Sequence, residues 1–459
     1  MPYILKKYQP WRNILFIIGE GFLIFLVINA LFVSWSGYGT YREMFFLFIF
    51  RALVAALVFQ LCFYYFDLYN LSVIPKFSDH MLEVLQAFGF GCIALALIYY
   101  IFPFLTISTR VFWSAMVAAG MGVFAWRFFY FRVLERKMFT TPIALIGTGE
   151  AAGEVLASIE SKKDSGFKVA AFVGEDNPDV VPRGVPVYKD VKDLRPLCSK
   201  RGIERIVIAV DEKRGMPMHE LIRYKFMGID VHDMVRFYED LTGKVMVERV
   251  NPSWLLFSDG FYVGLTRRIV KRLMDVSVAS VMLLFSLPVF LISAIIIKLE
   301  SPGEVFYRQE RVGKNGKAFS VIKFRSMRPD AEKDGPVWAQ TDDDRVTRYG
   351  HFTRKTRIDE LPQLINVLKG DMSFVGPRPE RPMFVAELEK SIPFYTIRHV
   401  VKPGITGWAQ IYYPYGASEE DALRKLEYDL YYIKNLSVTI DLATIFQTVK
   451  VVLLQRGSR

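Results

Sequence analysis

The sequence contains very little cysteine, with three residues among 459, at positions 62, 92 and 198. They are widely spaced and form no C-x-x-C pair, so the sequence gives no sign of a disulfide framework. Such usage is typical of domains that face the cytosol. Cys62 and Cys92 lie in apolar runs, where a cysteine behaves as a small hydrophobic residue.

The sequence also lacks internal repeats, low-complexity tracts and any recognisable nucleic-acid reader motif. Its net charge of +11 accompanies a hydrophobic fraction of 52%. Basic residues lie beside apolar segments, at Lys6, Lys7, Arg12, Arg132, Arg136, Lys137, Arg267, Arg268, Lys271 and Arg272. A nucleic-acid protein would instead present a basic face with aromatic stacking platforms. We therefore expect attraction to membrane lipid and to phosphate ligands, and no nucleic-acid partner.

Four apolar stretches fill the first third of the chain, at about 14–35, 44–66, 82–103 and 109–131. Each approaches the roughly 20 residues that cross a bilayer as a helix. The first has no A-x-A-like cleavage site, so we do not interpret it as a signal peptide. Lysine and arginine cluster before the first stretch and after the fourth. Residues 1–138 are therefore predicted to form a four-helix transmembrane region with the N-terminus and everything after residue 132 in the cytoplasm.

Residues 139–250 alternate between strand-like and helix-like segments. Strands are expected at 141–147, 168–173 and 204–210, and Gly147-x-Gly149-x-x-x-Gly153 forms a tight turn that opens a helix. This alternation predicts an α/β Rossmann-like domain with a doubly wound parallel sheet. An NAD site would need an acidic residue about 20 positions beyond the glycines, and Glu175 and Asp176 come somewhat late. A structural or regulatory role is favoured over nucleotide binding.

Residues 251–266 are predicted to form a linker. The polar region that follows contains the candidate catalytic residues. Its central feature is the adjacent carboxylate pair Asp359 and Glu360. Apolar residues recur behind the pair at helical spacing, at Leu361, Leu364, Ile365 and Leu368. We expect a helix from Asp359 to Gly370, with Asp359 as its N-cap and Glu360 in its first turn. Pro362 has no N–H for a capping carboxylate, which weakens the capping interpretation.

Basic residues surround this pair in the sequence, at Lys323, Arg325, Arg354, Arg357, Arg378 and Arg381. Any one of them could simply pair with a nearby carboxylate on a solvated face. Arg378 is a better candidate because it lies between two prolines, which would fix its guanidinium at low entropic cost. Together with Gln363, these residues are the candidates for binding phosphate and substrate, while one carboxylate attacks or holds a metal ion.

The region that contains these residues resembles a known family, the bacterial sugar transferases. The resemblance rests on the motifs 301–317, 323–327, 359–373, 376–380 and 402–410, which occur in the family's order. These proteins are monotopic polyprenyl-phosphate hexose-1-phosphate transferases, and the match runs from about residue 267 to the C-terminus. The N-terminal spans and the Rossmann-like unit resemble the large members, whose corresponding unit is CoA-binding-like. The segment Trp254–Gly260 resembles the exosortase-associated exopolysaccharide branch.

The resemblance implies transfer of a hexose-1-phosphate from a UDP-hexose to undecaprenyl phosphate, with release of UMP, in exopolysaccharide or O-antigen synthesis. Asp359 would form a covalent phosphosugar ester, and Glu360 with Asp359 would hold Mg²⁺. Arg378 and Arg354 would contact phosphate, and Lys323 and Arg325 match such positions more weakly. The implied location is the bacterial inner membrane, with a cytoplasmic catalytic domain at 267–459. A homodimer through the membrane and Rossmann-like parts is also expected.

The apolar run 273–299 is long enough to span the membrane. A span would place the catalytic region outside the cell, away from cytoplasmic nucleotide sugars. Pro288 can kink a helix, and the resemblance implies a re-entrant helix that returns to the cytoplasmic face. The expected fold is thus a membrane α-helical bundle, an α/β Rossmann-like domain and a mostly α catalytic domain with a re-entrant membrane helix.

Two other functions remain open from the residues alone. A membrane-anchored nucleotide-sugar epimerase or dehydratase would share the spans and the Rossmann-like unit. Its Tyr-x-x-x-Lys pair could be Tyr188 and Lys192, which fall early in a turn-rich stretch. A non-enzymatic scaffold for an export complex would make Asp359 and Arg378 dispensable.

Overall fold

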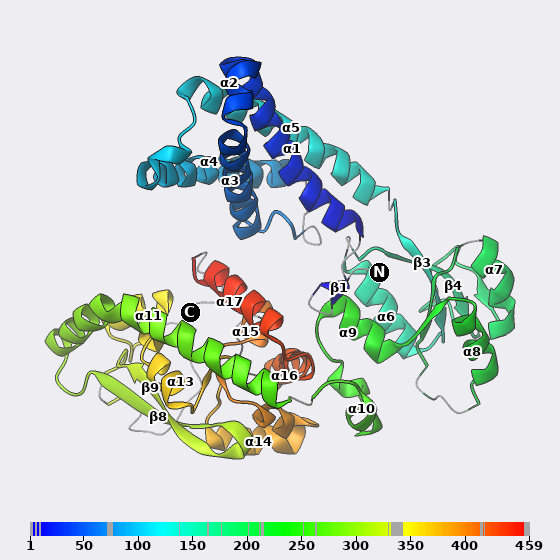
Figure 1. Ribbon diagram of the computed structural model, residues 1–459. Coiled ribbons are helices and arrows are strands. Elements are labelled where there is room, and N and C mark those ends of the chain that lie inside the picture. Colours follow the sequence, from blue (N-terminus) through cyan, green and yellow to red (C-terminus); the bar gives the residue numbers. More distant parts are fainter. Residues whose placement is uncertain are drawn as a thin grey trace. The chain divides into compact units, whose positions relative to one another are not determined.

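A computed structural model describes residues 3–4, 7–8, 11–70, 77–136, 138–162, 165–175, 177–200, 202–210, 212, 215–250, 252–261, 264–328, 330–331, 343–413, 416 and 418–453. Lys6, Lys137 and Asp176, which entered the sequence interpretation, lie outside these residues. The chain forms two compact units, Met1–Phe237 and Tyr238–Arg459 (Figure 1).

The first unit begins with a helical bundle made of α1 (Trp11–Ser36), the short α2 (Tyr38–Glu43), α3 (Phe45–Tyr65), α4 (Phe77–Ile101) and α5 (Thr109–Glu135). Helix α1 packs against α3 and α5, and α3 packs against α4. Phenylalanine and alanine side chains such as Ala52, Phe59 and Phe63 are fully buried between them. Helices α1, α3, α4 and α5 are each long and apolar enough to cross a membrane. The four predicted apolar stretches are confirmed as helices of membrane-spanning length.

One ion pair lies inside this bundle. Arg127 on α5 donates to Glu20 on α1 over 2.8 Å, and its other guanidinium nitrogen donates to the Leu68 carbonyl over 3.0 Å. Both charged side chains are almost completely buried. Among apolar helices a charge is stable only when it is paired and hydrogen-bonded, so this contact fixes α1 against α5.

The remainder of the first unit is a parallel sheet. Its strands are β3 (Thr141–Ile146), β4 (Phe167–Val173), β5 (Val187–Tyr188), β6 (Arg205–Ile208) and β7 (Asp230–Asp233), in the spatial order β5-β4-β3-β6-β7. The intervening helices are α6 (Glu150–Glu160), α7 (Arg195–Lys200) and α8 (Met218–Phe226). This order is that of the Rossmann fold, so the predicted doubly wound sheet is confirmed.

Gly147 shows why glycine is needed in the turn after β3. Its φ of +118° lies in the region that favours glycine, and an added Cβ would lie 2.1 Å from the carbonyl oxygen of Ala209. The turn therefore brings two parallel strands together at a distance that no side chain permits.

The second unit is mostly helical. It contains the end of α9 (Met234–Thr242), α10 (Pro252–Phe257), α11 (Leu265–Glu300), α12 (Arg348–Thr356), α13 (Gln363–Lys369), α14 (Pro382–Ser391), α15 (Trp408–Tyr412), α16 (Glu419–Lys434) and α17 (Val438–Leu453). Strands β8 (Phe306–Val312) and β9 (Ala318–Phe324) form an antiparallel hairpin, and β10 (Ser373–Val375) pairs in parallel with β11 (Gly404–Thr406). This mostly α architecture agrees with the expected catalytic domain.

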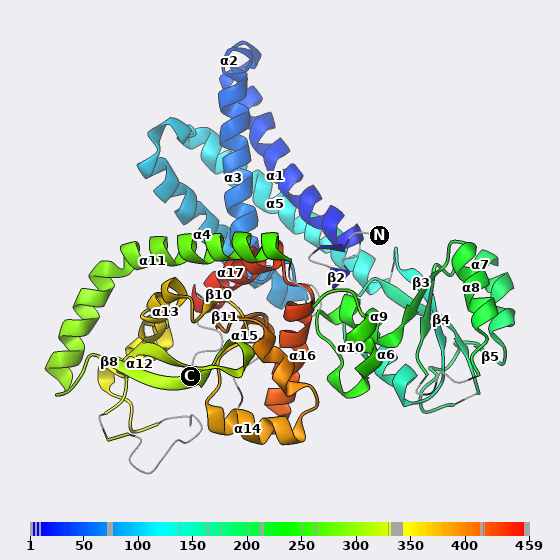
Figure 2. The same cartoon turned by 60° about the horizontal axis from the view of Figure 1, so that its bottom comes forward.

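Helix α11 contains Pro288 and is continuous, and it curves along the unit (Figure 2). Near its start, buried Asp275 accepts hydrogen bonds from the Ser373 hydroxyl and the Phe374 N–H. Near its end, the Ser293 hydroxyl lies 2.7 Å from that of Tyr349. Between these anchors its apolar side chains are exposed, among them Val281, Leu284, Phe285 and Leu291. Both ends of α11 are therefore attached to the same unit.

Two basic residues near the start of α11, Lys271 and Arg272, have hydrogen-bond partners inside the unit. Lys271 donates to Asp441 over 2.8 Å and to the Val375 carbonyl over 3.1 Å. Arg272 donates to the carbonyls of Val367 and Leu368, at the end of α13. Arg267 and Arg268 are exposed. Lys271 and Arg272 thus hold α11 to the unit.

Candidate active site

The carboxylate pair lies in an elbow between α12 and α13. Helix α12 ends where Arg357 adopts a left-handed conformation, with φ of +59°. A single 3-10 turn, Ile358–Glu360, follows, and α13 begins at Gln363. The expected helix from Asp359 is therefore wrong at its start, and Asp359 is not an N-cap. Pro362 explains the difference, because its ring supplies no N–H. The predicted stop at Gly370 is confirmed by its φ of +95°.

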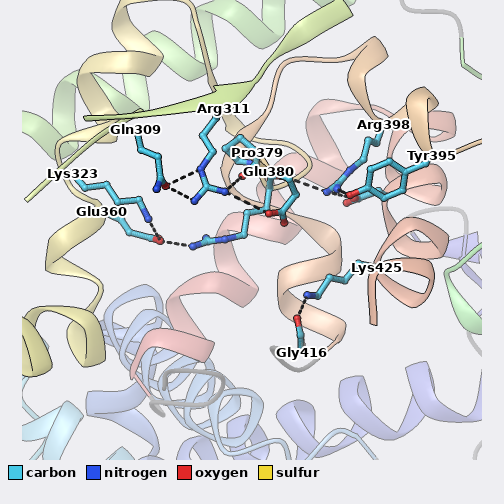
Figure 3. A network of polar contacts seen from close by, with 12 residues as sticks. Gln309, Arg311, Lys323, Glu360, Pro379, Glu380, Tyr395, Arg398, Gly416 and Lys425 are labelled. Carbon is cyan, nitrogen blue, oxygen red and sulfur yellow. Dashed lines mark hydrogen bonds and ion pairs between the residues drawn. The ribbon is translucent and has the colours of Figure 1, made fainter. Parts of the chain in front are cut away.

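Glu360 is held by three cationic side chains from three separate elements. Its Oε1 lies 2.8 Å from Arg378, 3.3 Å from Lys323 and 3.7 Å from Arg357. Figure 3 shows the contact between Glu360 and Lys323. Burial by itself would raise the pKa of this carboxyl, but the positive charges of Arg378, Lys323 and Arg357 outweigh burial and lower it below its ordinary value. These contacts favour the ionised form of Glu360, which anchors the three cationic side chains.

The pKa of Asp359 is shifted in the opposite direction from that of Glu360. It is 7% exposed, and its Oδ1 is buried without a hydrogen-bond partner among the described residues. Burial and the charge of Glu360 raise the pKa of Asp359 to about 6, against the pull of Lys323, Arg357 and Arg354. A buried polar atom without a partner is uncommon in folded proteins and marks a place where a ligand can bind.

Arg378 reaches Glu360 from a segment whose backbone is held at every carbonyl. The Pro377 and Glu380 carbonyls accept hydrogen bonds from the N–H groups of Gly404 and Val312, each over 2.9 Å. The Arg378 and Pro379 carbonyls accept from the side chains of Arg398 and Arg311, each over 3.1 Å. The two prolines fix φ and provide no N–H. The segment is therefore rigid, and it presents one guanidinium to the carboxylate pair.

The other predicted residues are distributed more widely. Arg354 donates to the Ser326 hydroxyl over 3.0 Å and acts electrostatically on Asp359. Arg325 donates to the Ser301 and Pro302 carbonyls at the end of α11, which is a helix-terminating position. Gln363 is buried in the first turn of α13, and half-buried Arg381 precedes α14. Asp359, Glu360, Lys323, Arg357 and Arg378 are brought together by direct contact or sequence adjacency.

The sequence interpretation missed the groups that support Arg378. Arg398 donates to the Arg378 carbonyl, to Asp429 over 3.0 Å and to the Tyr395 hydroxyl. Arg398 and Asp429 are 5% and 1% exposed. Nothing in their local sequence marks them as partners, because 31 residues separate them along the chain. A buried basic residue in a short helical segment would have been the one available signal.

The surroundings of Asp359 and Glu360 can be compared with what a Mg²⁺ ion requires of its ligands. No group of three or more histidine, cysteine or acidic side chains gathers within the described part of the chain. Mg²⁺ commonly takes one or two carboxylates and completes its shell with water and phosphate oxygens. Oε1 of Glu360 is occupied by cationic groups, so a metal ion would use the remaining carboxylate oxygens of the pair. The residues fit a metal that arrives with a phosphate substrate.

Comparisons with known proteins agree with this geometry. Residues 266–455 match the family described as bacterial sugar transferase, and residues 64–225 match a CoA-binding domain. A Klebsiella pneumoniae protein named UDP-glucose:undecaprenyl-phosphate glucose-1-phosphate transferase is 33% identical over 420 residues, which is 88% of each chain.

Two further relatives match over shorter regions. An Aeromonas hydrophila protein named UDP-N-acetylgalactosamine-undecaprenyl-phosphate N-acetylgalactosaminephosphotransferase is 44% identical over 251 residues, or 54% of this chain and 58% of that protein. An Escherichia coli (strain K12) UDP-glucose:undecaprenyl-phosphate glucose-1-phosphate transferase is 46% identical over 185 residues, 40% of each. These alignments cover about half of either relative.

The two carboxylates should respond oppositely to neutralisation. Glu360→Gln leaves Arg378, Lys323 and Arg357 without their anion, so we expect about 1–3 kcal/mol lower stability. The folded protein is more stable when Asp359 is protonated. This contribution to the stability is lost as the pH rises through the raised pKa of about 6. Asp359→Asn should therefore keep or raise the melting temperature at pH 7.5, measured on the full chain in detergent. Equal destabilisation by both variants would contradict the described electrostatics.

Proposed function

Because the chain belongs to the bacterial sugar transferase family, we propose that it transfers a hexose-1-phosphate from a UDP-hexose to undecaprenyl phosphate and releases UMP. The observation that carries this proposal is the buried, unpartnered oxygen of Asp359 beside a cluster of arginine and lysine side chains. Guanidinium and ammonium groups suit a diphosphate, and a carboxylate oxygen suits attack on phosphorus.

The reaction proceeds in two displacements. A carboxylate oxygen of Asp359 attacks the β-phosphorus of the UDP-hexose, and the bond to UMP breaks with its electron pair on UMP. The product is a phosphosugar ester on Asp359. A phosphate oxygen of undecaprenyl phosphate then attacks the same phosphorus, which returns the carboxylate and yields the lipid-linked diphosphosugar. Nucleophile and leaving group are thus both oxygens in each step.

Asp359 is favoured over Glu360 as the nucleophile for an electrostatic reason. The Oε1 of Glu360 is surrounded by Arg378, Lys323 and Arg357, and its lowered pKa makes it a weak base. The raised pKa of Asp359 gives its ionised form greater basicity, and its Oδ1 has no competing partner among the described residues. Nucleophilic strength increases with basicity within one class of groups.

The remaining residues hold the diphosphate. Arg378, Arg354 and Lys323 would bind its oxygens, and Arg357, Arg381, Arg325 and Gln363 are supporting candidates. Mg²⁺ held by Asp359 and Glu360 would neutralise charge on the diphosphate when bound. These cationic groups stabilise charge that develops on the departing UMP oxygen.

The membrane setting follows from α11. A straight helix of 36 residues measures about 54 Å, longer than the roughly 30 Å hydrocarbon core. Its two ends are both attached to one unit, through Asp275 and through Ser293. A spanning helix would separate these anchors by the bilayer, so a re-entrant helix is supported. We place the unit on the cytoplasmic face of the inner membrane, where nucleotide sugars are found.

The biological context of the proposal is the initiation of exopolysaccharide or O-antigen synthesis. The Rossmann-like unit is proposed to regulate the enzyme or to form a homodimer. The donor hexose is to be identified with a panel of UDP-glucose, UDP-galactose and their N-acetylated counterparts, each assayed with undecaprenyl phosphate for UMP release.

The covalent step is tested by Asp359→Asn. This variant should release no UMP above background from any donor in the panel, because an amide cannot form the ester. Wild-type protein quenched with donor and without acceptor should gain the mass of a hexose phosphate on the peptide containing Asp359. His351→Asn, an exposed change on α12, serves as the control and should retain activity. Full activity in Asp359→Asn would remove that residue from the mechanism.

The activity should also depend on the ionisation of Asp359. Only the carboxylate attacks, and burial raises its pKa to about 6. We expect kcat/KM for the donor to fall about tenfold per pH unit below that value and to be level above pH 7. The same profile in His351→Asn would assign the inflection to the carboxyl. A flat profile down to pH 5 would be inconsistent with this assignment.

Helix topology is tested with single cysteines in a variant that lacks Cys62, Cys92 and Cys198. Cysteines at Arg267 and at Lys314 flank α11, and both should react with a membrane-impermeant maleimide only after the inner membrane is opened. A cysteine at Gly39, which follows α1, should react in sealed spheroplasts and serves as the periplasmic reference. Reaction of the Lys314 position in sealed cells would mean that α11 crosses the bilayer.

A further inference from the structure

The segment that carries Arg378 is held by a second arginine that lies deeper in the fold. Arg398, in a 3-10 helix at Tyr395–Val400, is 5% exposed and donates to the Arg378 carbonyl over 3.1 Å (Figure 3). The same guanidinium nitrogen donates to Asp429 on α16 over 3.0 Å, and a second nitrogen donates to the Tyr395 hydroxyl. Polar contacts therefore run in series from Asp429 through Arg398 and Arg378 to Glu360.

We infer that Arg398 is a positioning residue, which fixes the backbone of Arg378 so that its guanidinium meets Glu360 and the donor diphosphate. This inference rests on the proposed function and extends it to a residue that touches neither reactant. Its element, the 3-10 helix, belongs to neither the carboxylate elbow nor the Pro377–Glu380 segment.

The prolines on both sides explain why the carbonyl matters. Pro377 and Pro379 fix their own φ angles and have no N–H. A residue before proline is already confined to extended backbone, so the freedom left near the side chain is a limited rotation of the Arg378 backbone within that region. That rotation sets the direction of the Arg378 carbonyl. A hydrogen bond to this oxygen therefore holds the side chain's base in place.

The chemistry of arginine fits this position better than that of lysine. A guanidinium offers five donors in a planar fork, so Arg398 can contact a carbonyl, a carboxylate and a hydroxyl together. An ammonium is a compact charge on a flexible stem and cannot reach all three with the same geometry. Asp429 neutralises the buried charge, which makes its burial tolerable.

A purely structural role for Arg398 makes a different prediction. The Arg398–Asp429 pair also joins the 3-10 helix to α16, and loss of that contact alone would lower stability and damage activity independently of Arg378. A positioning role acts through Arg378, so its effect should vanish when the Arg378 side chain is removed. A double-mutant cycle separates the two.

The experiment compares the full-length wild type, Arg398→Lys, Arg378→Ala and the double variant in detergent. We expect Arg398→Lys to lower kcat about 10- to 100-fold with a smaller change in KM, as small misplacements of catalytic groups do. In the Arg378→Ala background the same change should lower kcat less than about threefold. Equal losses in both backgrounds would overturn the inference. Arg424→Lys, at a half-buried arginine of α16 that pairs with Glu420 and Glu427 and, in the described part of the chain, makes no hydrogen bond or ion pair with the Pro377–Glu380 segment, is the matched control and should retain activity.

A second readout does not depend on turnover. Phenylglyoxal modifies accessible guanidinium groups, and Arg378 has a side chain that is 29% exposed. Its modification rate, followed by peptide mass spectrometry, should increase several-fold in Arg398→Lys and stay unchanged in Arg424→Lys. The rate at Arg354, bonded to Ser326, reports any general loosening. Unchanged labelling of Arg378 in a folded Arg398→Lys protein would overturn the inference.

The two readouts distinguish failure of this inference from failure of the proposed function. If the wild type releases no UMP from any donor, the proposed reaction is wrong. If Arg378 is nevertheless labelled faster in Arg398→Lys, the positioning role of Arg398 is still supported. If Arg398→Lys does not fold, Tyr395→Phe removes only the hydroxyl partner of Arg398. That milder variant should shift labelling and kcat in the same direction, and no shift in either would count against the inference.

Discussion

The site depends on a single carboxylate oxygen, Oε1 of Glu360. Groups from β9, from the left-handed turn after α12 and from the Pro377–Glu380 segment meet at this atom, at 3.3, 3.7 and 2.8 Å. Bringing three cations together is unfavourable without an anion between them. The carboxylate thus determines where the hairpin, the elbow and the segment can lie relative to one another, and it keeps the cations gathered for an incoming diphosphate.

The same arrangement separates the two acids chemically although they are neighbours in sequence. Lys323, Arg357 and Arg378 neutralise Glu360, and what remains of their field is too weak to offset the burial of Asp359. Divergent pKa values in adjacent carboxyls assign divergent roles, one as a fixed charge and one as a reactive group. The 3-10 turn at Ile358–Glu360 contributes by placing both side chains in buried positions without giving either to a helix cap.

Much of this could be predicted from the sequence, and what could not has a physical cause. Hydrophobic length identified the four long apolar helices, and strand alternation with the Gly147 turn identified the doubly wound parallel sheet. The sequence grouped Lys323 and Arg378 with the acidic pair as candidates for one site, and both contact Glu360. The start of α13 was missed because Pro362 interrupts a pattern of apolar spacing that otherwise continues. Arg398 and Asp429 were missed, and the contacts of Arg325 with the Ser301 and Pro302 carbonyls were not foreseen, because an arginine's partner is decided by tertiary packing, which periodicity does not encode.

Charge near the membrane illustrates the same limit and leads to a structural conclusion. Sequence position alone grouped Lys271 and Arg272 with lipid-binding residues, yet both are used inside the unit, on Asp441 and on the carbonyls that end α13. Asp275, one turn further along α11, is buried on Ser373. An apolar helix that enters the membrane would otherwise rotate and slide freely, since lipid offers it no directional contacts. Charged contacts at its start and the Ser293–Tyr349 contact near its end fix its register. The elements on either side of the acidic pair, α12 and α13, receive these anchors, so the position of Asp359 is fixed relative to α11.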